Sequence, residues 1–284
     1  MGFDGGAKNR PTATTAQTRP PIAPSTKERE HPGVPDHMTT SSSEIALEAR
    51  GTTKRYGRVT ALDDVSITVA RGSCVALVGE SGSGKTTLLR SFNRMVEPDT
   101  GDVFVDGDLV AATDPVALRR SLGYVEQEGG LLPHWTILRN AALVPWLQGR
   151  QDAESRARDA LDLVGLPAPT HVRYPNELSG GQRQRAALAR ALAGERATLL
   201  LDEPFGALDA ITRAGVQRMF ARVRLELRLS VLLVTHDLRE AFLLADRVAV
   251  MKAGGIEQIG APSELRDAPA SPYVAELLDT AGVA

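Results

Sequence analysis

The chain has 284 residues, of which 42% are hydrophobic, so it is long enough to bury the core of one large globular domain or of two small ones. Its formal net charge of −2 lacks the one-sided basic excess of most nucleic-acid-binding proteins, and we therefore expect no nucleic-acid partner. The only cysteine, Cys74, excludes an intrachain disulfide and a zinc site built from several cysteines, which favours a reducing compartment.

The N-terminal segment, residues 1–43, is rich in Pro, Thr and Ser and almost devoid of large apolar residues. Such a composition cannot bury enough apolar surface to order itself, so we expect a disordered tail here and a folded domain over residues 44–284. Met38 is an alternative start of the protein, which mass spectrometry of the native N-terminus would test. No run approaches the ~18 apolar residues of a membrane span, and no secretion signal precedes the domain, so we expect a cytoplasmic protein.

Alternating strands begin at Ile45, and the segment 65–69 places Val, Ile and Val on one face of a strand. An Asp-Gly turn between apolar strands in residues 102–110 predicts a hairpin, and hence an antiparallel sheet in this part of the chain. The apolar run 74–78 is typical of a buried parallel strand, in which Cys74 is a small hydrophobe rather than a reactive thiol.

A full match to the phosphate-binding loop G-x-x-x-x-G-K-[ST] follows this strand, and an amphipathic helix follows the loop. The backbone N–H groups and the positive end of the helix dipole then point at a bound anion. Lys85 can reach the terminal phosphates of a nucleotide, and the Thr86 hydroxyl is placed to ligate Mg²⁺. The alternative, a chance glycine-rich loop that caps a helix, does not explain why strand, loop and helix agree. The predicted nucleotide-binding residues of the loop are Gly79, Glu80, Ser81, Gly82, Ser83, Gly84, Lys85, Thr86 and Thr87.

Residues 136–196 have a helical period and contain Pro133, Pro145, Pro167, Pro169 and Pro175 in or beside them, which we expect to divide the stretch into separate helices. This predicts an inserted helical subdomain over about 128–196. Strands then return at 198–201 and 230–235 with a helix from about 208 to 229 between them, which is the alternation of a parallel sheet. A strand at 247–251, a Gly254-Gly255 turn and a short helix near 273–278 complete the predicted elements.

Two carboxylates follow the apolar strand 198–201 directly. Asp202 is suited to the Mg²⁺ shell, and Glu203 is suited to orient the water that attacks a γ-phosphate. The alternative is a pair of solvated acids at a strand end, against which the rigid Pro-Phe-Gly turn that follows argues.

A second helix N-terminus that suits an anion begins at Leu-Ser-Gly-Gly-Gln, residues 178–182. One nucleotide cannot obviously use both helix ends within a monomer. With the phosphate loop and the segment Leu-Asp-Glu-Pro at 201–204, this motif makes the chain from about Ile45 to Leu278 resemble the nucleotide-binding subunit of an ATP-binding cassette (ABC) transporter.

The resemblance implies an α/β fold: a P-loop NTPase (RecA-like) core with a parallel sheet, an antiparallel β subdomain and an inserted α-helical subdomain. It also implies that two copies of the chain bury two ATP molecules with Mg²⁺ between them. The residues that would contact the ATP of the partner subunit are Ser179, Gly180, Gly181 and Gln182.

Further residues match family positions. Tyr56 takes the place of the aromatic residue that stacks on adenine, although a strand tyrosine is often a core residue. Asp209 matches the aspartate at the dimer interface, and its alternative role is that of a helix N-terminal acid. His236 matches the histidine that contacts the γ-phosphate, where it would report the hydrolysis state rather than act as the main base.

Gln127 matches the glutamine that touches Mg²⁺ and water and begins the loop that senses the membrane subunit. Its neighbours Glu126 and Glu128 depart from the family pattern, because they are acidic where relatives more often carry apolar or neutral residues, and Gln127 remains the better candidate by register. His134 and Trp135 follow on the face where this family docks its permease. The alternative for Trp135 and Trp146 is a place in the core of the helical subdomain.

The resemblance implies an ATP-hydrolysing, energy-coupling subunit that lies on the inner face of the cell membrane with integral permease subunits, and indirectly with a solute-binding protein. The segments 93–98 and 130–134 are most similar to the importer branch for glycine betaine, choline and related osmoprotectants. Alternatives are a polar amino-acid importer or an exporter of the same family. A non-transport ABC ATPase that acts on ribosomes or DNA is less favoured, because the chain shows one cassette and near-neutral charge.

Overall fold

The computed structural model describes residues 44–127 and 129–283, so the expected disordered tail over residues 1–43 lies outside the described residues. A four-stranded antiparallel sheet comes first, in the order β2-β1-β4-β5. Its strands are β1 (Ile45–Tyr56), β2 (Val59–Ala70), β4 (Thr100–Val105) and β5 (Asp108–Leu109). The predicted hairpin is confirmed: Asp106 and Gly107 both have positive φ, as a two-residue type I′ turn requires.

A six-stranded sheet in the order β10-β9-β3-β8-β7-β6 forms the second layer, and all of its neighbours are parallel except β10 with β9. The strands are β3 (Cys74–Val78), β6 (Gly123–Val125), β7 (Thr198–Asp202), β8 (Ser230–Val234), β9 (Arg247–Lys252) and β10 (Gly255–Gly260). The helices are α1 (Lys85–Phe92), α2 (Pro115–Ser121), α3 (Ile137–Leu147), α4 (Ala153–Leu163), α5 (Gly180–Leu192), α6 (Ala210–Glu226), α7 (Leu238–Leu244), α8 (Pro262–Asp267) and α9 (Pro272–Ala281). Three short 3₁₀ turns span Val110–Ala112, Ala168–Thr170 and Pro175–Glu177. The predicted fold class is confirmed.

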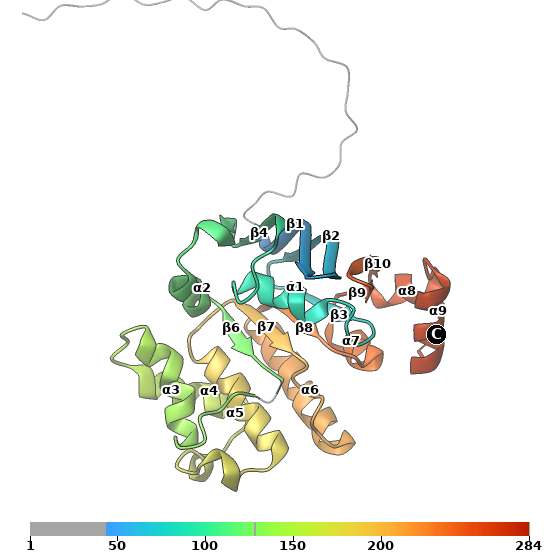
Figure 1. Cartoon of the computed structure of the whole chain (residues 1–284). Coiled ribbons are helices and arrows are strands. Elements are labelled where there is room, and N and C mark those ends of the chain that lie inside the picture. Colours follow the sequence, from blue (N-terminus) through green and yellow to red (C-terminus); the bar gives the residue numbers. More distant parts are fainter. Residues whose placement is uncertain (1–43, 128, 284) are drawn as a thin grey trace, which may run out of the picture. The chain divides into compact units, whose positions relative to one another are not determined.

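The core has two parts because successive side chains of β3 point to opposite faces of the sheet. Val75 and Leu77 pack with α1 and the antiparallel sheet, so that α1 lies between the two sheets (Figure 1). Cys74, Ala76 and Val78 face the other side, where α5 and α6 pack. Burial raises the pKa of the Cys74 thiol to about 12, which fits a small core hydrophobe rather than a nucleophile.

One proline expectation was wrong. Pro145 lies inside α3, which continues to Leu147. Pro145 has no backbone N–H to donate to the Ala141 carbonyl one turn earlier, so α3 loses one helical hydrogen bond there and ends two residues later. The other four prolines lie outside the α-helices, as expected, with Pro169 inside the second 3₁₀ turn and Pro175 at the start of the third.

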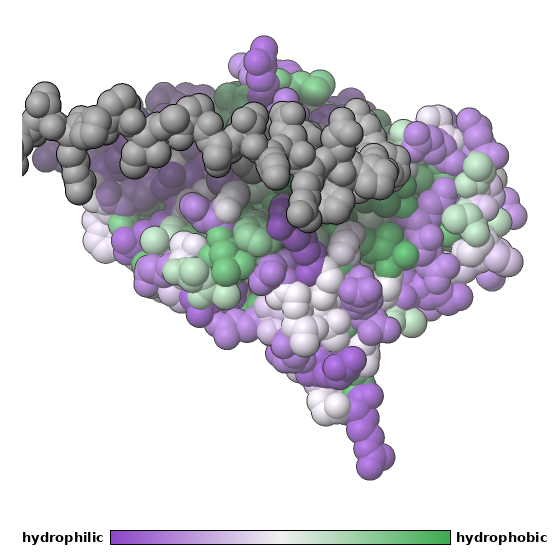
Figure 2. All heavy atoms as spheres, turned by 90° about the horizontal axis from the view of Figure 1, so that it is seen from above, coloured by the Kyte–Doolittle hydropathy of each residue, from purple (hydrophilic) through white to green (hydrophobic). Residues whose placement is uncertain are grey.

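No helix in the described part of the chain combines the length and the apolar composition that crossing a bilayer requires. On the face shown in Figure 2, polar residues dominate, and apolar residues form small separate patches between them.

Candidate functional site

The phosphate loop connects β3 to α1 and is pressed against two other strands. A Cβ on Gly79 would come 2.1 Å from the Met251 carbonyl oxygen, and one on Gly84 would come 2.3 Å from the Ala61 carbonyl oxygen. Both glycines also have positive φ, so only glycine fits these two positions. The tight packing fixes the loop at the N-terminus of α1, where backbone N–H groups can receive an anion.

The Lys85 ammonium group lies over this loop. It donates hydrogen bonds to the carbonyl oxygens of Gly79 and Glu80, both at 2.7 Å. Lys85 as a whole is only 6% exposed. Burial lowers the pKa of Lys85, while the nearby carboxylates of Glu203 and Asp202 act in the opposite direction. A cation is thus held where the terminal phosphates of a nucleotide would enter.

A hydroxyl and a carboxylate meet beside Lys85. The Thr86 hydroxyl donates to Oδ1 of Asp202 at 2.9 Å, and Asp202, at the end of β7, is only 4% exposed. Mg²⁺ prefers such oxygen ligands and usually takes one or two carboxylates, with water and substrate phosphates filling the remaining positions. Across residues 44–127 and 129–283 there is no group of three or more His, Cys, Asp or Glu side chains that could hold a metal.

Arg90 is a site residue that the sequence analysis missed. Its guanidinium lies 3.4 Å from Oδ2 of Asp202. The signal was available, because Arg90 stands four residues after Thr86 on α1 and therefore shares its helix face.

Glu203 and His236 form a second pair at the ends of neighbouring strands. Nδ1 of His236 lies 3.1 Å from Oε2 of Glu203, and the parallel pairing of β7 and β8 places Asp202 opposite Val234. Glu203 has φ of +47°, which is unusual for a residue other than glycine and is typical of strain at functional sites. Burial of Asp202 excludes the alternative of two solvated acids.

Gln127 leaves the sheet at the same edge. The pairing of Val125 with Leu201 places β6 beside β7, so Gln127 and Asp202 follow neighbouring strand ends. Gln127 is exposed and lines a groove of about 330 Å³ together with Gly180 and Leu208. The structure therefore brings the glutamine next to the helix end of the second anion motif. Arg190 on α5, also missed by the sequence analysis, donates to the Gly129 carbonyl at 2.7 Å and holds the loop after Gln127.

The second anion motif caps α5. Ser179 Oγ accepts from the Gln182 amide, and the Gln182 side chain accepts from the Ser179 amide, which forms a capping box. Gly181 allows close approach to α6, because a Cβ there would lie 2.3 Å from Cγ2 of Thr212. Within the described residues, no hydrogen bond or ion pair joins this motif to the phosphate loop.

Tyr56 and Asp209 have clear local settings. Tyr56 is 51% exposed at the end of β1, so the core alternative is wrong, and Lys54 Nζ lies 5.4 Å from its ring centroid. Asp209 is the N-cap of α6 and accepts from the Thr212 amide at 3.1 Å. Hydrogen bonds from the Thr212 side chain and then from the Thr212 amide lower the pKa of Asp209, which fits the helix N-terminal role.

Both tryptophans of the helical segment line one surface groove of about 580 Å³ on α3 and the start of α4. Trp146 is 64% exposed, so the core alternative is wrong for it. Trp135 is half-buried, and Arg139 stacks on it at 4.2 Å from the ring centroid. His134 is exposed and meets the Trp135 ring edge-on.

A buried acid, Glu240, lies on α7 four residues after His236. It accepts from Gln217 Nε2 at 2.9 Å, and Thr235, Asp237 and Arg213 also face it. Burial is the largest cause that raises its pKa, to about 7; Asp237 adds to the rise, and the hydrogen bonds and Arg213 oppose it.

This pKa predicts a pH-dependent stability. The folded protein binds the Glu240 proton more tightly than the unfolded chain does. The stabilisation that this proton gives to the folded state is therefore complete below about pH 4.5 and is lost as the pH rises through about 7. The free energy of unfolding of Glu240→Gln minus that of the wild type should increase by a few kcal/mol over this range. Urea unfolding against pH measures it, with the exposed Glu226→Gln as control. A difference that does not change with pH contradicts the prediction.

Comparisons with known proteins agree with this geometry. The family described as ABC transporter matches residues 62–206, just over half of the chain. The choline transport ATP-binding protein OpuBA of Bacillus subtilis is 44% identical over 82% of this chain and 62% of that protein. The sulfate/thiosulfate import ATP-binding protein CysA of Bordetella bronchiseptica is 46% identical over 81% of this chain and 66% of that protein. The chain thus spans about three fifths of the length of the first curated relatives.

Solved structures are similar over most of the chain. A dimeric ATP-binding cassette in a post-hydrolysis state, bound to ADP and Pi, has a TM-score of 0.69 and 31% identity, covering 76% of this chain and 98% of that one. The cassette cbiO1 from Clostridium perfringens, described as part of the ABC transporter complex cbiONQ, has a TM-score of 0.72 and 25% identity, covering 84% and 95%.

Proposed function

Because the chain belongs to the ABC transporter family, we propose that it hydrolyses ATP as the energy-coupling subunit of an ABC importer for glycine betaine, choline or related quaternary amines. The observation that carries the ATPase proposal is the meeting of two pairs beside Lys85. These are Thr86 with Asp202, and Glu203 with His236. The relatives from Bacillus subtilis whose names include choline or glycine betaine support the solute class.

In this proposal the phosphate loop, residues 79–87, receives the phosphates of ATP, and Thr86, Asp202 and Gln127 hold Mg²⁺. The metal would offset the charge of the phosphates once bound. Lys85 gives up carbonyl partners of its own loop and donates to the terminal phosphates, where the charge-assisted bonds are stronger.

Glu203 is the proposed catalytic carboxylate. It accepts a proton from the attacking water and orients it toward the γ-phosphate, while His236 holds the carboxylate through Nδ1 and contacts the γ-phosphate. The chain's contribution is therefore mostly positioning and charge stabilisation.

Dimerisation completes the site in this proposal. The N-terminus of α5 at Ser179, Gly180, Gly181 and Gln182, of which Ser179 is exposed, receives the ATP that the partner copy holds, and Asp209 lies at the interface. Tyr56 stacks on adenine with its exposed ring. Hydrolysis removes the γ-phosphate that holds the two copies together, which reopens the dimer.

The domain over residues 44–284, with its helical subdomain over about 128–196, would lie on the inner face of the membrane. The groove of Trp135 and Trp146 is the proposed contact for the permease, because it combines exposed aromatic surface with Arg139. The solute-binding protein acts only through the permease.

A second solute class, sulfate or thiosulfate, is favoured by relatives that are 46% identical.

Transport assays test the solute. Co-purified with its permease and reconstituted in lipid vesicles, the chain should hydrolyse MgATP faster when the binding protein is loaded with a quaternary amine. Stimulation by sulfate or thiosulfate instead would shift the assignment within the family. Stimulation by nucleic acid alone would contradict the transport role.

A further inference from the structure

Arg213, in the first turn of α6, contacts two segments that are far apart in the sequence. Its Nη2 donates to the Leu208 carbonyl at 2.9 Å and to the Gly206 carbonyl at 3.4 Å, both in the loop that follows Glu203. Its Nη1 lies 3.7 Å from Oδ2 of Asp237, the residue after His236. One guanidinium group therefore joins the segments that carry the two members of the Glu203–His236 pair.

The contacts close a ring around that pair. Gly206 lies directly beside it, since a Cβ on Gly206 would come 3.6 Å from Cε1 of His236 and 3.7 Å from Oε2 of Glu203. The direct bond between Glu203 and His236 forms the opposite side of the ring. A shift of the guanidinium thus moves the surroundings of both site residues at once.

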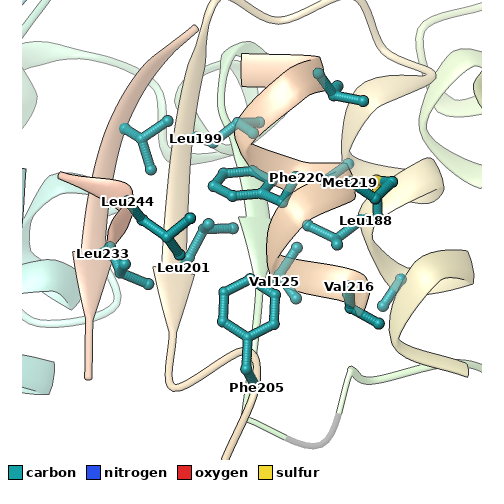
Figure 3. Packing of buried hydrophobic residues seen from close by; sticks show 14 of the residues in the cluster. Val125, Leu188, Leu199, Leu201, Phe205, Val216, Met219, Phe220, Leu233 and Leu244 are labelled. Carbon is teal, nitrogen blue, oxygen red and sulfur yellow. The ribbon is translucent and has the colours of Figure 1, made fainter. Parts of the chain in front are cut away.

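Core packing and a buried hydrogen bond hold the other residues near the Glu203–His236 pair. Phe205 is fully buried against Phe220 of α6, with ring centroids 6.1 Å apart, and Figure 3 shows both rings within the core cluster. One turn further along α6, the bond between Gln217 and Glu240 forms a second link to α7. Nε of Arg213 is buried and has no partner among the described residues, so the contacts of the guanidinium group run through Nη1 and Nη2.

We propose that Arg213 is a positioning residue for the Glu203–His236 pair, holding the loop after Glu203 and the segment after His236 in register. The expected loss of kcat rests on the proposed ATPase function, whereas the coupling between the two segments does not. The hydrogen bonds and the ion pair of Arg213 go to Gly206, Leu208 and Asp237 rather than to the phosphate loop, so its loss should act on kcat and leave nucleotide binding nearly unchanged.

The test compares three variants with the wild type. Arg213→Ala removes the fork, and Arg213→Lys keeps the charge but not the paired donors. Asp237→Asn keeps an oxygen that can cap α7, as Oδ1 does now for Arg239 at 2.9 Å, but loses the charge that faces Arg213. The control is Arg218→Ala, an exposed arginine on the same helix.

Two readouts decide the outcome. In nucleotide-free protein, Arg213→Ala should increase hydrogen–deuterium exchange in both segments, 203–209 and 235–240. Asp237→Asn and Arg213→Lys should cause a smaller increase, and Arg218→Ala should cause none. In steady-state hydrolysis, Arg213→Ala should lower kcat by about 10- to 100-fold with KM for ATP within about twofold, because small misplacements of site groups are costly. Arg213→Lys should recover part of the loss.

Unchanged exchange in segment 235–240 overturns the proposal, whatever happens to kcat. So does a wild-type kcat in Arg213→Ala. If the wild type itself does not hydrolyse MgATP, the proposed function fails, and the exchange result still decides whether Arg213 couples the two segments.

Discussion

Glu203→Gln should lower the rate of MgATP hydrolysis by about 10²- to 10³-fold or more, while ATP still binds. The amide cannot accept the proton of the attacking water, and loss of a positioned base or charge-stabilising group typically has an effect of this size. The variant preserves the shape of the side chain and its capacity to bond His236, so the phosphate loop with Lys85 remains intact.

Phosphate release measures the rate, and binding of a fluorescent ATP analogue measures affinity. Glu226→Gln, which changes an exposed carboxyl at the end of α6, is the matched control and should behave as the wild type. Release of phosphate at the wild-type rate by Glu203→Gln would remove Glu203 from its proposed role.

Lys85→Ala should weaken ATP binding by about 10- to 100-fold, because a charge-assisted hydrogen bond to phosphate contributes roughly 1.5–3 kcal/mol. It also leaves the Gly79 and Glu80 carbonyls without their donor, so we expect a lower thermal midpoint in the absence of nucleotide. Calorimetric titration with MgATP and thermal unfolding check the two effects.

Lys85→Arg serves as the comparison that keeps the charge. Because the guanidinium is larger and Lys85 is buried, this variant should unfold at a lower temperature than the wild type and still bind ATP more tightly than Lys85→Ala. Equal affinities for the wild type and Lys85→Ala would show that the cation does not meet the phosphates.

Contiguous sequence signals predicted the elements that local chemistry controls. The five apolar residues of β3 and the Asp-Gly hairpin after β4 are defined by their own side chains, and the structure has both. The short strand β6 has three residues, and β10 begins and ends with glycine, so neither carries a pattern strong enough to predict.

Parallel pairing explains how much of the site could be predicted. Asp202, Glu203 and His236 follow apolar strands, and neighbouring parallel strands end at one edge, so their meeting could be expected from the sequence. Arg213 could not be found this way, because its contact to Asp237 depends on how α6 and α7 pack. Arg90 could be predicted only in part. Its spacing of four residues from Thr86 indicates the same helix face, but its contact with Asp202 depends on how α1 packs beside β7.

The central claim is that two copies of the chain enclose two ATP molecules, each copy supplying the helix end at Ser179 that the other lacks. Light scattering of the Glu203→Gln variant with saturating MgATP tests it most directly. The account predicts the mass of a dimer, which returns to that of a monomer when nucleotide is removed. A monomer mass that persists with MgATP, even in the presence of the permease, would contradict the account.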